Sequence, residues 1–152
     1  MRILCAIGLR RGAELIRRLS RMAGPGDELV LVHVLDEGPR HDLNHLEGTI
    51  RAHHSHRQEL DAAEQDAGSA ALKEAAEAAA AAGLSAVTRL ERGRPEQAVV
   101  ALARELTADM VAVLARETPH AHPVQGPPSI GHTARFIIDH ATSDVMVFRE
   151  RA

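Results

Sequence analysis

The sequence is poor in aromatic residues and in cysteine, and these shortages exclude several classes of protein. Its 152 residues include two phenylalanines but no tryptophan and no tyrosine, so it lacks the aromatic side chains on which single-stranded nucleic acid stacks. Its one cysteine, Cys5, rules out an internal disulfide and fits a reducing compartment. The net charge of −3 argues against a basic surface that binds duplex DNA. We therefore expect no nucleic-acid partner.

Long hydrophobic runs are missing as well. No apolar stretch approaches the roughly 20 residues that a membrane-spanning helix needs, and the apolar start of the chain, Arg2–Ile7, is too short for a secretion signal. We therefore expect a cytoplasmic protein without a membrane partner. The hydrophobic content of 45% predicts a folded aliphatic core, and the length predicts a single domain over residues 1–152.

What the sequence does contain is an alternation of apolar runs and amphipathic segments. The apolar runs predict five strands, at Arg2–Ile7, Glu28–Leu35, Ala86–Leu90, Asp109–Leu114 and Val145–Phe148. Helical periodicity predicts four helices, at about residues 11–22, 58–82, 95–106 and 130–141. Strands that alternate with helices imply right-handed crossovers, so we predict an α/β fold with a parallel sheet and helices on both faces.

Local signals set the expected ends and faces of these helices. Gly24-Pro25-Gly26 is expected to end the first helix, which buries Met22 among other apolar residues, and Gly83 to end the second, in which Gly68-Ser69 is a candidate kink. In the third helix the inward positions are Ala98, Val99, Leu102 and Leu106.

The closing stretch Ser129–Arg149 gives the clearest pattern. Ser129 or Thr133 is expected to cap the last helix, because a hydroxyl accepts hydrogen bonds from the unpaired N–H groups of a first turn. Its predicted buried face consists of Ile130, Ala134, Ile137, Ile138 and Ala141. The apolar run Val145–Phe148 predicts a strand that is covered on both faces.

In order and spacing, several of these segments resemble the universal stress protein family. The resemblance rests on Arg2-Ile-Leu-Cys-Ala-Ile, Leu31-Val-His-Val34, Gly93-Arg-Pro-Glu, Ala108-Asp-Met-Val-Ala-Val113 and the stretch from Ile130 to Arg149, including Gly131, Arg135, His140 and Ala141. It implies a five-stranded parallel sheet that is Rossmann-like, of the adenine nucleotide alpha hydrolase-like type, with strand order 3-2-1-4-5. It also implies a stress-response role and a homodimer that pairs through Val145, Met146, Val147 and Phe148. An apolar edge strand favours such pairing on physical grounds.

The chain departs from the family where nucleotide-binding members hold phosphate. Those members carry Gly-x2-Gly-x9-Gly followed by Ser or Thr after the fourth strand, and their first strand ends in Asp. Here Leu114 and Glu117 replace two glycines, His132 follows the third, Gly131, and Gly8 replaces the acid. Four prolines between residues 115 and 128 also remove N–H donors. We therefore predict a protein without a cofactor that does not bind ATP in the usual manner and acts through a protein partner.

Two alternatives remain open for the residues at the carboxyl ends of the first and fourth strands. The cleft residues Gly8, Arg10, Arg116, Gly131, His132 and Thr133, with Arg11 beside them, suit a small anion, ATP or another adenine nucleotide; otherwise Arg10 and Arg11 are solvated surface charges. A weak nucleotide hydrolase would need a metal-holding acid, for which Glu117 is the nearby candidate. Because no nucleophile elbow, phosphate loop or zinc signature is present, we expect no enzyme activity and no catalytic residue.

The histidines are numerous but poorly patterned for a metal. His41 and His45 are four residues apart and His53, His54 and His56 are dense, yet no cysteine accompanies them, so we predict a solvated segment and no metal site. His33 in the second strand and His140 in the last helix are expected to be structural. Cys5, in an apolar strand, is expected to be buried and poorly reactive.

Overall fold

The computed structural model describes residues 1–37, 53–115 and 129–149, and its strands form one parallel sheet. The strand order β3-β2-β1-β4-β5 is the predicted one. The strands are β1 (Arg2–Ala6), β2 (Glu28–Asp36), β3 (Ser85–Gly93), β4 (Met110–Leu114) and β5 (Asp144–Phe148). The predicted α/β class is therefore confirmed, with β3 three residues longer at its carboxyl end than the apolar run indicated.

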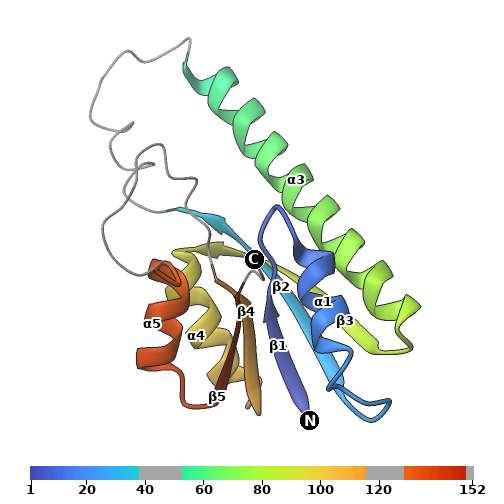
Figure 1. The fold of residues 1–152 in the computed structure, drawn as a ribbon. Coiled ribbons are helices and arrows are strands. Elements are labelled where there is room, and N and C mark those ends of the chain that lie inside the picture. Colours follow the sequence, from blue (N-terminus) through green and yellow to red (C-terminus); the bar gives the residue numbers. More distant parts are fainter. Residues whose placement is uncertain (38–52, 116–128, 150–152) are drawn as a thin grey trace.

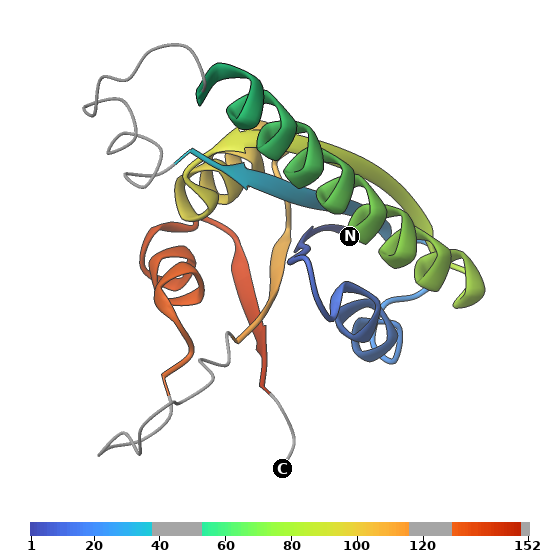
Figure 2. The same cartoon turned by 90° about the horizontal axis from the view of Figure 1, so that it is seen from above.

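Helices cover both faces of this sheet (Figure 1). The described residues form α1 (Gly12–Leu19), α3 (His53–Ala81), α4 (Pro95–Glu105) and α5 (His132–His140). Side chains alternate between the faces of a strand, so Ile3 and Cys5 of β1 join a core with α1 and α3, whereas Leu4 joins a second core with α4 and α5. Figure 2 shows the two helix layers on opposite sides of the sheet.

Helix α3 is the longest element and extends past the sheet at its His53 end (Figure 1). It continues unbroken through Gly68 and Ser69 and is straight, so the expected kink is absent. Its end is as predicted: Gly83 has φ +72°, and its N–H and that of Leu84 donate to Ala80 O and Ala79 O, both at 3.0 Å. This is the Schellman arrangement that satisfies the last carbonyls of a helix.

Helix α1 is shorter than its periodicity indicated. It ends at Leu19, and residues 20–22 form a turn in which Ser20 Oγ donates to Arg17 O at 2.9 Å. The side chain of Met22 is therefore 54% exposed, which contradicts the predicted buried position. Gly24-Pro25-Gly26 lies beyond this turn and does not itself end the helix.

Helix α4 packs as expected, but the last helix and strand are less buried than predicted. Val99 and Leu102 of α4 are buried. Ile138 of α5 is 47% exposed, because the buried face of α5 is centred on Ala134 and Ile137. Strand β5 pairs with β4 at the end of the sheet; Phe148 is buried, while Val145, Met146 and Val147 are half-buried. Side chains of β5 pack on cores at both faces of the sheet, as expected, but its position at the end of the sheet leaves three of them only half-buried.

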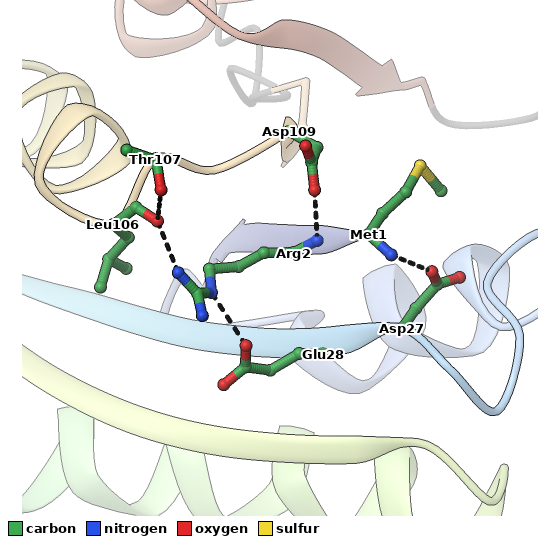
Figure 3. A network of polar contacts seen from close by, with 7 residues as sticks. All are labelled: Met1, Arg2, Asp27, Glu28, Leu106, Thr107 and Asp109. Carbon is green, nitrogen blue, oxygen red and sulfur yellow. Dashed lines mark hydrogen bonds and ion pairs between the residues drawn. The ribbon is translucent and has the colours of Figure 1, made fainter.

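A polar network closes the edge of the sheet opposite to the candidate site (Figure 3). The N–H of Arg2 donates to Asp109 Oδ2 at 2.6 Å, its Nε to Glu28 Oε2 at 2.8 Å and its Nη1 to Leu106 O at 2.7 Å. One side chain thereby joins β1, β2 and the connection between α4 and β4.

Within the described residues, no helix is both long and apolar enough to cross a membrane.

Candidate functional site

The turn between β1 and α1 forms one side of the candidate site. The N–H of Ile7 still pairs with Val32 O at 2.8 Å, and the next three residues, Gly8, Leu9 and Arg10, are exposed. Arg11 then caps α1 with φ +65°, a left-handed conformation that is uncommon for a residue other than glycine. Such strain is often found near functional sites.

The side chain of Arg11 turns back onto α1. Its Nε donates to Glu14 Oε2 at 2.7 Å and its Nη2 to Glu14 Oε1 at 3.0 Å, a two-pronged contact that fits the guanidinium fork. These hydrogen bonds hold the pKa of Glu14 below its usual value. Arg10 is left exposed at the edge, and Arg116 lies outside the described residues.

His33 holds this turn in place through a hydrogen bond to the backbone. Its Nδ1 lies 2.7 Å from Ile7 O, and because a carbonyl only accepts, Nδ1 carries the proton. The imidazole is 8% exposed and packs against Gly68 of α3, where an added Cβ would lie 2.5 Å from His33 Cδ2. A Cβ on Gly12 would similarly lie 2.8 Å from Ile7 Cγ2. The predicted structural role of His33 is confirmed.

The end of β4 forms the second side of the site. Leu114 pairs with Phe148 of β5 and packs against the core beneath α1 and α3. The N–H of Ala115 then donates to Phe148 O at 2.9 Å. The chain therefore remains part of the sheet through Ala115, so this N–H is already paired. Glu117, the candidate acid, lies outside the described residues.

The start of α5 forms the third side. Gly131 is the N-cap, with φ 87° and ψ 161° and no side-chain cap, so the expected caps were wrong. Ser129 Oγ accepts from the Gly131 N–H at 3.2 Å, and Thr133 lies inside the helix, half-buried. His132 is exposed, with its Nε2 3.6 Å from Glu96 Oε1 of α4.

The described residues of the candidate site share one edge of the sheet. The carboxyl ends of parallel strands meet at a common edge, which is where ligands bind in open α/β sheets. However, α1 and α5 cover opposite faces, and within the described residues no hydrogen bond or ion pair joins Gly8 or Arg10 to Gly131, His132 or Thr133. Sequence reasoning missed Glu96, because a contact between two helices distant in sequence leaves no local signal.

Other candidate residues have structural surroundings. Burial raises the pKa of the Cys5 thiol to about 12, which confirms a buried and poorly nucleophilic cysteine. The ring of His140 stacks on Phe136 with centroids 4.0 Å apart, and its Nδ1 lies 2.9 Å from Phe136 O. In the part of the chain that the structure describes, no group of three or more His, Cys, Asp or Glu is placed to hold a metal. His41 and His45 fall outside that part, and α3 begins at His53.

Comparison with known proteins settles the family. The model of the universal stress protein family matches residues 1–149. This chain belongs to that family. The fold of this universal stress protein is similar to that of the universal stress protein UspA from Lactobacillus plantarum, at a TM-score of 0.71 and 21% identity, with 98% of this chain and 97% of that chain covered.

Two further similar structures contain nucleotides. One is the universal stress protein from Archaeoglobus fulgidus in complex with dAMP, at a TM-score of 0.67 and 18% identity, covering 97% of this chain and 96% of the other. The other is a family protein from Arabidopsis thaliana with AMP bound, at a TM-score of 0.65 and 14% identity, covering 100% and 93%. At these identities the likeness concerns the fold. No curated protein matches the sequence.

Proposed function

We propose that this universal stress protein is a homodimer that acts through protein partners and does not hold ATP in the family's usual manner. The observation that carries the proposal is the pairing of Ala115 N–H with Phe148 O at 2.9 Å. A phosphate cradle needs free backbone N–H groups that point at the anion. At the start of this loop, where nucleotide-binding relatives place a glycine, the chain instead carries Leu114, which pairs with β5 and whose side chain packs against the core beneath α1 and α3.

The other two sides of the site support the same proposal. Gly8 provides no carboxylate at the end of β1. At the start of α5, Glu96 lies 3.6 Å from His132, and its side chain is only 14% exposed. A carboxylate held in this position disfavours a second anion at the same helix end, because like charges repel most strongly where water is partly excluded.

The proposed dimer forms through the free edge of β5. Met146 and Phe148 face the core of α1 and α3, Val145 and Val147 face that of α4 and α5, and three of these four residues are only half-buried. Pairing with a second copy would cover them and continue the sheet.

Exposed Ile138 lies on the same side of the molecule. Helical geometry places it about 100° around α5 from buried Ile137, on the flank opposite to His132, which contacts α4. Because α4 contacts β2 and β3 whereas α5 contacts β5, the flank away from α4 lies toward the β5 edge. A dimer would therefore shield Ile138 as well.

Thermal denaturation with added nucleotide tests this function. A ligand that binds only the folded state raises stability by about 2.7 kcal/mol at one hundred times its Kd. We expect ATP, AMP and dAMP with magnesium to leave the Tm unchanged at about 1 mM, where a micromolar ligand would give a stabilisation of this order. A clear rise with any of them would contradict the proposal.

A nucleotide or anion sensor of the same fold is the second candidate. Two observations favour it: α5 starts without a side-chain cap, so its first N–H groups lack that acceptor, and two relatives contain dAMP or AMP. If nucleotide raises the Tm, Arg10→Ala and His132→Ala should reduce that rise. Glu96→Gln should increase it, because the competing negative charge is removed.

A further inference from the structure

The segment from residue 9 to residue 22, which contains α1, carries a concentrated positive charge. Residues 9–22 contain five arginines, Arg10, Arg11, Arg17, Arg18 and Arg21, and one acid, Glu14. This short segment therefore has a formal charge of +4 in a chain whose total is −3. Leu15, Ile16 and Leu19 occupy the buried face of α1, so Arg17 lies on its outer side, while Arg10 precedes the helix and Arg21 lies in the turn that follows it.

The five arginines are not equivalent. Arg11 and Arg18 share Glu14, with nearest N–O distances of 2.7 and 3.5 Å, and Arg18 also lies over the ring of Phe148, 5.0 Å from its centroid. Arg10, Arg17 and Arg21 are exposed, and no ion pair within the described residues involves them. Their charge is available to a partner.

Exposed apolar side chains lie at both ends of this charged segment. Leu9, before α1, is 58% exposed, and Met22, after it, is 54% exposed. Leu9 and Met22 therefore flank the eight residues of α1, one before and one after the exposed arginines. Arginine and methionine are enriched in protein interfaces relative to the rest of the protein surface.

We propose that the exposed residues of this segment, Leu9, Arg10, Arg17, Arg21 and Met22, called here the α1 surface, bind an acidic, amphipathic segment of a partner protein. Carboxylates of the segment pair with the three exposed arginines, and its apolar side chains cover Leu9 and Met22. The proposal rests on the proposed action through protein partners and names the partner's chemistry.

Charge and composition favour this occupant over nucleic acid or a lipid surface. No aromatic residue lies between positions 9 and 22 to stack on a base. A membrane would engage an uninterrupted apolar face, whereas the two exposed apolar residues here are separated by charge.

Fluorescence anisotropy with a defined probe tests the α1 surface. The probe is a labelled peptide of about 12 residues that alternates pairs of Glu with Leu, so that its helix has one acidic and one apolar face. The same peptide with Gln in place of Glu controls for apolar binding. We expect the acidic peptide to bind the full-length protein with a micromolar Kd and the Gln peptide to bind at least tenfold more weakly.

Paired variants locate the binding. Arg17→Gln/Arg21→Gln should weaken the acidic peptide at least fivefold, whereas Arg89→Gln/Arg94→Gln, an equal charge change at exposed positions of β3 and the start of α4, should change Kd less than twofold. Equal weakening by both variants, or no binding of the acidic peptide, would overturn the proposal. Tighter binding of single-stranded DNA or phosphatidylserine vesicles, lost in the first variant, would also overturn it by assigning the surface to another class of partner.

These outcomes are separate from those for the proposed function. Binding of a nucleotide would contradict the proposal that the protein acts without ATP, but it would leave the expected affinity for the acidic peptide unchanged. If neither the peptide nor a nucleotide binds, the proposal for the α1 surface alone is refuted, and the proposed dimer would bind its partners elsewhere.

Discussion

His33 and Gly68 are in such close contact that no side chain fits between them. A Cβ built on Gly68 would lie 2.5 Å from His33 Cδ2 and 3.1 Å from Nε2. Because His33 also binds Ile7 O at 2.7 Å, it cannot move away without releasing the end of β1. The close approach of α3 to β2 therefore explains why residue 68 is a glycine. This approach also keeps His33 in place, and His33 in turn holds the β1–α1 turn through Ile7 O.

Gly68→Ala is therefore expected to destabilise the protein. Alanine gains up to about 1 kcal/mol of helix propensity over glycine, but overpacking of a filled core costs about 1–3 kcal/mol, so we expect a net loss of up to about 2 kcal/mol. Urea denaturation measures it. Ser69→Ala, at an exposed position of the same helix, should be neutral or slightly stabilising. A Gly68→Ala variant more stable than wild type would show that His33 is free to shift.

The sequence predicted the fold better than the site because the two depend on different information. Apolar runs and breakers such as Gly83 act locally, so all five strands and the ends of most helices follow from them. By contrast, the exposure of Ile138 depends on how α5 is rotated on the sheet, and periodicity does not distinguish it from its buried neighbour Ile137. The left-handed Arg11 and the Glu96–His132 contact depend on packing between distant elements, which no local pattern encodes.

Thr107 offers a stabilising substitution. It follows α4 with φ +47°, a left-handed conformation that is costly for a β-branched residue, while glycine adopts it freely. Its Oγ1 donates to Leu106 O at 2.7 Å, a carbonyl that also accepts from Arg2 (Figure 3). We expect Thr107→Gly to raise stability by about 0.5–1 kcal/mol, because relief of the strain exceeds the loss of one exposed hydrogen bond.

Thr107→Ala separates the two effects. Alanine keeps the unfavourable backbone conformation and loses the hydroxyl, so this variant should be no more stable than wild type. If calorimetry showed the alanine variant to be as stable as the glycine variant, the backbone strain would not be the cause.

Glu14 predicts an acid-dependent loss of stability. Hydrogen bonds from Arg11 come first among the causes that lower its pKa from the ordinary value of 4.5. A group whose pKa is lower in the folded state stabilises the fold above its unfolded pKa, and this contribution disappears as pH falls through the folded pKa. The stability difference between wild type and Glu14→Gln should therefore be constant near neutrality and should shrink below pH 4.5. A difference that stays the same down to pH 3 would argue against the Arg11–Glu14 contact.

The proposed dimer predicts different effects at two exposed apolar residues. Ile138 on α5 is 47% exposed and Val87, on the opposite edge strand β3, is 49% exposed, so both should tolerate lysine in the folded protomer. Ile138→Lys should shift the sedimentation equilibrium toward monomer at least tenfold, because a charge would be buried at the β5 interface. Val87→Lys should leave it unchanged. A monomeric wild type, or equal behaviour of the two variants, would contradict the dimer.

Calorimetric titration of the purified protein with ATP and magnesium tests the central claim most directly. The Ala115 N–H is already paired with Phe148, and Leu114 replaces the first loop glycine. The account therefore predicts no heat of ATP binding at micromolar concentrations. Binding of one ATP per chain at micromolar affinity would contradict it and would mean that other residues at this edge of the sheet form the phosphate site.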